Sequence, residues 1–366
     1  MAAAVGGVLA GALSVACDPG AARAAGADTW PPFVLVLGLL LVGAVAEHDG
    51  LFLAAGHRLA GIARSGATFY VGAALLVAVT TATLNLDTSV VFVTPILVAT
   101  AARRGDPPHV VLCLSLLLAN AGSLWLPGSN LTNLIVLGPD GAQGAGFLAV
   151  MWPAALAATA VTVLGVWVWG RRDLAGRLLR RESHPPFRPG LGAGAVAAVT
   201  GIVIAVGDPA PAVALIGAGA LAVRAAQRRI DARAVVGSVG LPVLVGLFGV
   251  AVAMGTLGHA WGGLARALDH TGTDGGAVVA AALTVLINNL PAAALLAARH
   301  PAHPAQILVG LDLGPNLFLT GSLAWFLWIK TVRATGGRPP IARATRLGAV
   351  VVPLSMAAAL GALAWR

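Results

Sequence analysis

Ile287-Asn288-Asn289-Leu290-Pro291 places two amides and a proline inside a segment that is otherwise apolar enough to lie in a bilayer. Two further polar interruptions follow it, Gly310-Leu311-Asp312-Leu313-Gly314-Pro315-Asn316 and Thr320-Gly321-Ser322. Polar groups at membrane depth are costly unless they pair with one another or bind something. Irregular backbone is tolerated there only where it packs against protein or lines a cavity. The stretch therefore predicts broken helices around a buried polar site.

A second, looser copy of this pattern lies earlier in the chain. It consists of Asn85-Leu86-Asp87-Thr88, Asn120-Ala121-Gly122-Ser123 and Gly128-Ser129-Asn130-Leu131-Thr132-Asn133. Asp87 aligns with Asn289, Ser123 with Asn316, and Gly128-Ser129 with Gly321-Ser322, at separations of 193 to 202 residues. Two matching sets of broken helices in one apolar chain are typical of secondary transporters built from two repeats.

Composition places the protein in a membrane. Of the 366 residues, 58% are hydrophobic and only 10% are charged, and the mean hydropathy is +0.88, far above that of an ordinary globular domain. The net charge of +9 comes from short arginine runs between apolar segments, with no aromatic interleaving, which argues against a nucleic-acid partner. Cys17 and Cys113 lie far apart and indicate neither a disulfide framework nor a metal site. We expect an all-α polytopic membrane protein without a cofactor.

Apolar segments and their interruptions divide the chain into five parts. Residues 3–17 lack a charged leader region and a clear cleavage site, so we interpret them as a retained span. Neither arm of the first hairpin reaches the ~20 residues that a crossing needs, so we expect it to be re-entrant. The parts are an N-terminal span and outer loop (1–30), a first repeat (31–170) with a hairpin (66–102) and a broken helix (109–138), basic loops with two linking spans (171–240), a second repeat (241–345) with a hairpin (275–298) and a broken helix (305–331), and a C-terminal span (346–366).

The distribution of basic residues predicts the orientation. If the two hairpins do not cross the membrane, all basic residues fall on one side except Arg23, Arg266, Arg299 and Arg366. By the positive-inside rule that side is cytoplasmic, which places the N-terminus inside the cell and the C-terminus outside. The two hairpins then open on opposite sides of the cell membrane. The charge count thus predicts two inverted repeats without assuming them.

The polar side chains at the breaks are the candidate site. Backbone dipoles favour anions at half-helix N-termini and cations at half-helix C-termini. The amides and hydroxyls can bind a small oxyanionic or hydroxyl-rich solute, and the alternative is that they only pack helices together. The candidate substrate-binding residues are Asn85, Thr88, Asn120, Ser123, Gly128, Ser129, Asn130, Asn133, Asn288, Asn289, Asn316, Thr320, Gly321 and Ser322.

The two carboxylates at the breaks, Asp87 and Asp312, are the candidates for proton or cation coupling. A carboxylate in a low-dielectric medium is stabilised by a bound proton or cation, which suits it to load and release one. The alternative is that each carboxylate caps a half-helix N-terminus and stays ionised. Glu47-His48-Asp49 and His259 are interpreted as solvated ends of spans, and Cys113 as a small core residue.

At these residues the chain resembles a known family. Leu286-Ile287-Asn288-Asn289-Leu290-Pro291, Gly310-Leu311-Asp312-Leu313-Gly314-Pro315 and Thr320-Gly321-Ser322-Leu323-Ala324 closely resemble the arsenical-pump membrane proteins of the arsenite-efflux permease type. These belong to the ion transporter superfamily, which also includes sodium-coupled divalent-anion symporters. The resemblance covers the chain from about residue 31. It implies two inverted repeats, each with a re-entrant hairpin and a discontinuous helix.

The same resemblance implies export of arsenite or antimonite driven by protons. The first hairpin tip departs from the Asn-Asp-Gly of that family and reads Leu86-Asp87-Thr88, and the chain is shorter than is usual. The symporters carry Ser-Asn-Thr at each tip, which this chain lacks, so sodium coupling through the tips is not indicated. No Walker A pattern is present, so ATP dependence would need a partner subunit. Dimerisation is left open.

The leading hypothesis is a proton-coupled antiporter that exports a neutral trihydroxy metalloid such as arsenite or antimonite. Arginine is absent from every predicted break, and amides and hydroxyls suit such a solute. The first alternative is a sodium- or proton-coupled permease of the same superfamily for a dicarboxylate or an inorganic oxyanion. The alternative from another class is a non-transporting membrane scaffold. An enzyme is not expected, because Ser129 and Ser322 have no His or Lys at a suitable depth to act as a base.

Overall fold

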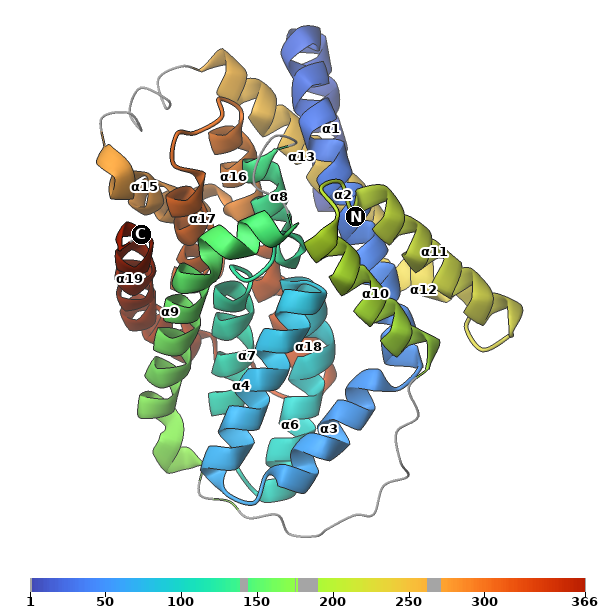
Figure 1. Ribbon diagram of the computed structural model, residues 1–366, viewed down its shortest axis with the longest axis vertical. Coiled ribbons are helices and arrows are strands. Elements are labelled where there is room, and N and C mark those ends of the chain that lie inside the picture. The colour runs from blue at the N-terminus through green and yellow to red at the C-terminus, as the bar shows by residue number, and fades with distance from the viewer. Residues whose placement is uncertain (1, 139–143, 175, 177–189, 262–270, 366) are drawn as a thin grey trace.

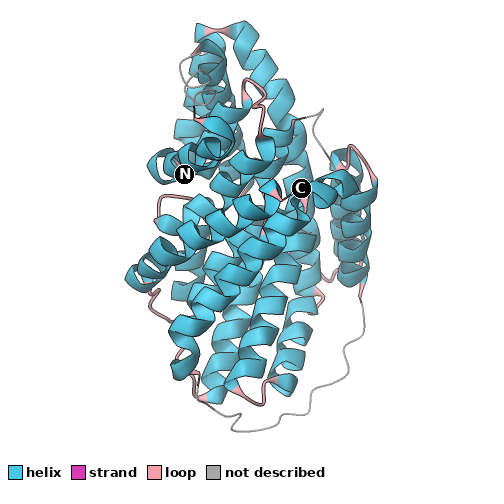
Figure 2. Ribbon diagram, turned by 60° about the vertical axis from the view of Figure 1, so that its left-hand side comes forward, coloured by secondary structure: helices cyan, strands magenta, loops and turns pink. Residues whose placement is uncertain are grey.

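The computed structural model describes residues 2–138, 144–174, 176, 190–261 and 271–365, and every described element is a helix (Figures 1 and 2). Most of the basic loop expected at residues 171–189, and the connection with Arg266 and Asp269, lie outside the described residues. Six helices are long and apolar enough to cross a membrane by length and composition: Pro19–His48, Gly66–Thr83, Leu86–Arg104, Gly144–Asp173, Ala232–Ala260 and Ile341–Ala364. The expected all-α polytopic fold is confirmed.

The N-terminal helices pack closely through glycine. Helix α1 (Ala2–Cys17) lies against α13 (Leu241–Ala260), where a side chain on Gly7 would collide with the backbone of Gly246. Small residues let apolar helices approach in this way, which compensates for the weak hydrophobic drive between helices in lipid. Helix α2 (Pro19–His48) in turn packs on α11 (Ala210–Ala226).

The prediction of an outer loop before residue 31 is wrong, because α2 already begins at Pro19. Asp18 caps α2 by accepting a hydrogen bond from the Ala21 N–H at 2.9 Å, and Pro19 occupies the first helical turn, where its missing N–H costs nothing. The helix then continues through Pro31 and Pro32. Packing on α11 and α13 therefore outweighs the tendency of this proline pair to end a helix.

The first half has helices at the residues of the expected hairpin and broken helix. Both arms of the hairpin are among the helices long enough to cross a membrane, so its re-entrant course stays a prediction. A short helix, α3 (Leu51–Ile62), leads into the hairpin, which consists of α4 (Gly66–Thr83), α5 (Leu86–Thr88), a π-helical turn (Ser89–Val93) and α6 (Thr94–Arg104). The broken helix consists of α7 (His109–Gly122), a 3₁₀ turn (Pro127–Ser129) and α8 (Leu131–Leu137). It is followed by α9 (Gly144–Gly170), a 3₁₀ turn (Arg171–Asp173), α10 (Leu191–Ala205), α11 and α12 (Ala232–Val239).

The second half repeats the element types after α13. Its hairpin is α15 (Gly272–Ile287) and α16 (Asn289–Ala297), and its broken helix is α17 (Pro304–Leu313), a 3₁₀ turn (Gly314–Leu317) and α18 (Leu323–Ala334). The chain ends with α19 (Ile341–Ala364), which packs on α9. Figure 1 shows α4 and α6 in the lower part of the molecule and α15 to α17 in the upper part.

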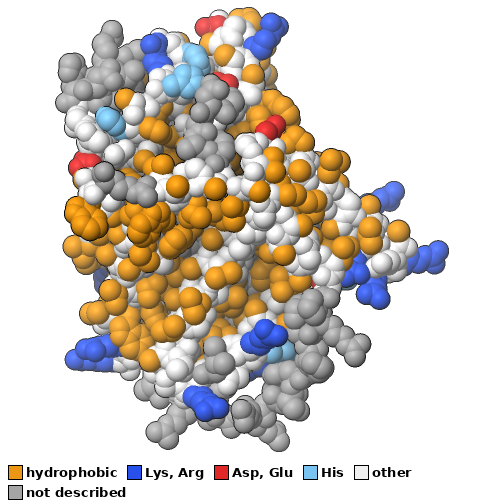
Figure 3. All heavy atoms as spheres, in the orientation of Figure 1, with side chains coloured by type: hydrophobic (Ala, Val, Ile, Leu, Met, Phe, Trp, Pro, Cys, Tyr) orange, Lys and Arg blue, Asp and Glu red, His pale blue; other side chains and the backbone are white. Residues whose placement is uncertain are grey.

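Charged side chains lie at the ends of the molecule. Figure 3 shows apolar side chains over the middle of one face, with Lys and Arg at both its upper and lower ends and at the tip of α11 and α12. One arginine is buried: Arg224 donates to Asp49 Oδ2 at 2.6 Å, and the Gly192 N–H donates to the same oxygen at 2.7 Å. The interpretation of Glu47-His48-Asp49 as a solvated end is therefore wrong for Asp49, which joins α2 to α10 and α11.

This ion pair predicts a pH dependence of stability. Burial raises the pKa of Asp49, but the hydrogen bonds from Arg224 and Gly192 outweigh it, so the net pKa lies below the ordinary 3.8. The stabilisation is therefore fully present above pH 3.8 and is lost as the pH falls through the lower folded-state value. We expect Asp49→Asn to lower the free energy of unfolding by about 1.5–3 kcal/mol at neutral pH, because Arg224 loses a charged acceptor. The difference in melting temperature from wild type should shrink only below pH 3.8. The exposed neighbour Glu47→Gln serves as the control, and an equal effect of both variants would contradict the assignment.

Candidate functional site

Each hairpin turns at an asparagine that caps the helix after it. In the first hairpin Asn85 has extended backbone, and its Oδ1 accepts from the Thr88 N–H at 2.7 Å. In the second, Asn288 has a φ of +79° and a ψ of 153°, a backbone conformation that is rare for any residue other than glycine. Its Nδ2 donates to the Thr320 carbonyl at 2.9 Å, and the Asn289 N–H donates to the Gly321 carbonyl at 2.8 Å. The second tip is thereby bonded to the break between α17 and α18.

Each broken helix resumes after a polar residue with extended backbone. Asn130 precedes α8, and its Oδ1 accepts from the Thr132 N–H at 3.3 Å. Ser322 precedes α18 with φ −152° and ψ 162°, but its side chain makes no capping hydrogen bond. The preceding 3₁₀ turns contain Pro127 and Pro315, which lack the N–H that a continuous α-helix would use.

The four breaks meet at one small cavity, which we call the tip cavity. Its volume is about 50 Å³. Both hairpin tips, both broken helices, α2 and α13 contribute to its walls. The polar lining residues are Asn85, Asp87, Asn130, Thr132, Asn288, Asn289 and Ser322, and the apolar ones are Val36, Leu86, Leu131, Leu244, Leu247, Leu290, Leu323 and Ala324.

Several polar atoms at the tip cavity are buried without a hydrogen-bond partner among the described residues. They are Asn85 Nδ2, Asp87 Oδ1 and Ser322 Oγ. Thr88 Oγ1, in the residue after Asp87, also lacks a partner among the described residues but does not line the cavity. A buried polar group without a partner costs about 1–3 kcal/mol, and folded proteins rarely leave several of them together. The donors Asn85 and Ser322 are therefore free to bind a ligand, and Asp87 is free to accept a proton or a cation.

Asp312 lies outside the lining of the tip cavity, at the end of α17, and is fully buried. Its carboxylate accepts from Ser123 Oγ at 2.7 Å, Asn130 Nδ2 at 2.8 Å and Thr132 Oγ1 at 3.0 Å. Each of these donors belongs to the first broken helix or its break. Asp312 therefore joins the two broken helices and holds Asn130 and Thr132 at the cavity wall.

A second cross-link between the broken helices lies beside Asp312. Asn120 Nδ2 donates to Asn316 Oδ1 at 2.9 Å, and Asn316 Nδ2 donates to the Leu117 carbonyl at 2.9 Å. Trp328 Nε1 also reaches the first broken helix, donating to the Leu112 carbonyl at 3.1 Å. The break between α7 and α8 is therefore tied to the second half of the chain at several points.

The remaining predicted site residues hold backbone together at the breaks. Asn133 Nδ2 donates to the Ser123 carbonyl at 2.8 Å, Ser129 Oγ to the Ala82 carbonyl at 3.2 Å, and Thr320 Oγ1 to the Val285 carbonyl at 2.6 Å. A side chain on Gly321 would come within 2.5 Å of Pro315 Cα. The predicted residues that do not line the tip cavity are Thr88, Asn120, Ser123, Gly128, Ser129, Asn133, Asp312, Asn316, Thr320 and Gly321.

Sequence reasoning missed Thr132 and the apolar wall from α2 and α13. Thr132 stands inside the run that was identified, between Leu131 and Asn133, but one-dimensional spacing did not separate its side chain from that of Asn133. Val36, Leu244 and Leu247 lie on long unbroken helices. No pattern in the sequence distinguishes these three residues from the other apolar residues of the same helices.

Comparison with known proteins agrees with a transporter. The family model described as a citrate transporter, CitMHS, matches residues 1–321. No curated protein matches the chain. Among solved structures, the YdaH transporter of Alcanivorax borkumensis, reported to have an unusual topology, is similar with a TM-score of 0.54 and 14% sequence identity, over 94% of this chain and 87% of that one. At this identity the likeness shows the fold alone.

These findings favour the citrate transporter family over the arsenite-efflux family that the sequence resembles. The resemblance to the arsenical-pump proteins of the arsenite-efflux type is not confirmed, whereas a multi-pass membrane transporter is. The family and the structural neighbour are transporters rather than enzymes. Because the family model covers most of its length, the chain belongs to the CitMHS citrate transporter family.

Proposed function

We propose that the protein is a secondary transporter of a small carboxylate anion of the citrate class, coupled to a cation that binds at Asp87. One observation carries the proposal: four helices begin at the tip cavity. They are the helix Leu86–Arg104, the short α8, α16 and α18, and the first residues of each line the cavity. Because backbone dipoles make a helix N-terminus positive, their convergence favours a negatively charged ligand.

The side chains at the cavity suit the same ligand. Asn85 Nδ2 and Ser322 Oγ are donors without a partner among the described residues, and Asn289 adds an amide. No Lys, Arg or His is among the described residues that line the cavity. A carboxylate would therefore be held by hydrogen-bond donors and helix termini, an arrangement that anion transporters use at broken helices.

Asp87 supplies the coupling. An ionised carboxylate beside a bound anion repels it, and at low dielectric the repulsion is strong. A proton or cation on Asp87 removes the repulsion, so the anion and the cation bind together. The side chain has the position this requires, since it lines the cavity and its Oδ1 has no partner among the described residues.

The arrangement of the hairpins supports alternating access. The second-half hairpin lies at the upper end of the molecule and the first-half hairpin at the lower end (Figure 1). In the sequence, all but four basic residues fall on the side where the first hairpin opens. We infer from this that the two halves are inverted repeats and that the lower end is cytoplasmic, so that each hairpin can gate the cavity from one side.

Arsenite or antimonite export is the second candidate. It is favoured by the small volume of the tip cavity, about 50 Å³, and by the absence of basic side chains from its lining. A neutral trihydroxy solute needs only amides and hydroxyls. Proteoliposomes separate the two candidates, because the carboxylate transporter should accumulate citrate in response to a cation gradient and should leave arsenite unaffected.

Ser322→Ala is the sharpest test of the tip cavity. Loss of one donor to a charged ligand costs about 1.5–3 kcal/mol, so citrate uptake should fall by about 10- to 100-fold. Ser355→Ala is the matched control, since Ser355 is also buried but donates within α19 to the Val352 carbonyl. Equal uptake by both variants would remove the tip cavity from the mechanism. Arsenite accumulation without citrate uptake would favour the second candidate.

A further inference from the structure

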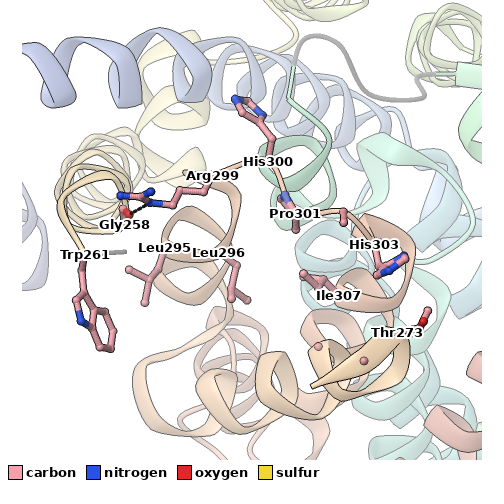
Figure 4. A pocket seen from close by; sticks show the side chains of 13 residues that line it. Gly258, Trp261, Thr273, Leu295, Leu296, Arg299, His300, Pro301, His303 and Ile307 are labelled. Carbon is pink, nitrogen blue, oxygen red and sulfur yellow. Dashed lines mark hydrogen bonds between the residues drawn. The ribbon is translucent and has the colours of Figure 1, made fainter. Parts of the chain in front are cut away.

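A second, larger cavity lies at the open end of the second hairpin, and we call it the mouth cavity (Figure 4). Its volume is about 580 Å³, within the usual range for pockets that bind small molecules. Its walls come from the end of α13, the first turn of α15, the end of α16 and the connection to α17. The hairpin thus has the tip cavity at one end and the mouth cavity at the other.

The lining of the mouth cavity is basic. Arg299, His300 and His303 fall within five consecutive residues, and no carboxylate is among the described lining residues. Figure 4 shows Arg299 and Trp261 on one side and His303 and Thr273 on the other, with Leu295 and Ile307 between them. Arg299 and His303 therefore lie on opposite sides of an apolar floor, whereas the ring of His300 points away from it.

Arg299 is held in place by the helix it faces. Its Nε donates to the Gly258 carbonyl at 3.2 Å and its Nη2 to the His259 carbonyl at 2.6 Å, both at the end of α13. Nη1 has no partner among the described residues. The guanidinium is held at the cavity wall by two neutral acceptors, and no carboxylate of the described residues pairs with it.

The backbone around the mouth cavity is also fixed in an unusual way. His300 has a φ of +45°, which is uncommon for a residue other than glycine. A side chain on Gly258 would come within 2.6 Å of the Leu295 carbonyl oxygen, so α13 lies close against α16. The N-termini of α15 and α17 lie at the cavity without a side-chain cap.

We propose that the mouth cavity is a second anion site, which binds a small di- or tricarboxylate before it reaches the tip cavity. The Arg299 guanidinium, the His303 imidazole and two helix N-termini supply the donors, and the volume accommodates a molecule that the tip cavity does not hold in this conformation. The proposal rests on the proposed function only for the choice of carboxylate, because the basic lining is independent of the tip cavity.

Trp261 makes the site observable, since it lines the cavity and is 52% exposed. Citrate added to the purified protein in detergent should change the tryptophan fluorescence in a saturable way, and Trp261→Phe should abolish this change. Arg299→Gln should weaken the binding at least ~10-fold. Because Arg299 also bonds to α13, the double variant His300→Gln/His303→Gln provides a second test that leaves those bonds intact. Arg23→Gln, at an exposed arginine on α2, is the control.

The arms of the experiment separate this site from the proposed function. Ser322→Ala should lose transport but keep the fluorescence titration, so failure of the tip cavity and failure of the mouth cavity give different results. A response that survives in the His300/His303 and Arg299 variants, or no response at all, would overturn the proposal. In nanodiscs, a response to phosphatidylglycerol but not to citrate would assign the basic lining to lipid and overturn it as well.

Discussion

Replacing Arg104 with methionine is expected to lower the free energy of unfolding by about 3–5 kcal/mol, because it leaves a buried carboxylate without its partner. Arg104 is 1% exposed, and its Nε donates to Asp106 Oδ2 at 2.6 Å. It also donates to the carbonyls of Ala63 and Gly176, and its guanidinium lies 5.1 Å from the ring centre of Phe69. One side chain thus joins the two ends of the first hairpin to the segment after α9.

The matched control for this variant is Arg64→Met, the same substitution at an exposed arginine near the start of the hairpin. Thermal melting in detergent, followed by tryptophan fluorescence, should separate the two variants clearly. The double variant Arg104→Met/Asp106→Leu should recover much of the loss, because it removes the unpaired carboxylate as well. If Arg104→Met and Arg64→Met have the same melting temperature, the hydrogen bonds of Arg104 do not stabilise the hairpin.

The positions of the breaks could be predicted from the sequence because their causes are local. The first hairpin was predicted at residues 66–102 and is Gly66–Arg104, and the second was predicted at 275–298 and is Gly272–Ala297. Asparagine, glycine and proline act on the backbone beside them, so an apolar run that contains them ends where they stand. At Pro31-Pro32 packing against other helices keeps the backbone helical, so the predicted loop before residue 31 is absent from the described residues.

The composition of the site could not be predicted in the same way. Asn120 and Asn130 were equivalent in the sequence, yet Asn120 pairs with Asn316 while Asn130 lines the cavity. The difference depends on how half-helices from the two halves of the chain pack against each other. The spacing of residues within one segment carries no information about that packing. The motif Asn288-Asn289-Leu290-Pro291 describes a backbone turn, so it identified a transporter superfamily but did not select a citrate family over an arsenite one.

The two carboxylates show the same limit, and they lead to the last prediction. Both were candidates for coupling, but Asp87 lines the tip cavity with an unpaired oxygen, whereas Asp312 accepts three hydrogen bonds outside it. We infer that Asp87 carries the cation and that Asp312 is a positioning residue. Asp87→Asn should therefore abolish citrate accumulation driven by a cation gradient, while citrate exchange between the two sides, which needs no net cation movement, should continue.

Asp312→Asn should instead abolish both accumulation and exchange. Asparagine keeps one acceptor oxygen but turns an NH₂ donor toward donors that previously shared a carboxylate. Each charge-assisted hydrogen bond contributes about 1.5–3 kcal/mol, so losing the two from Asn130 and Thr132 should reduce exchange by at least ~100-fold as these side chains leave the cavity wall. Asp312→Asn should also lower the melting temperature, whereas Asp87→Asn, which removes no hydrogen bond at the unpaired Oδ1, should not. If Asp312→Asn kept exchange and lost only accumulation, the coupling role would pass to Asp312, because a residue that merely positions the cavity wall cannot affect one mode of transport and spare the other.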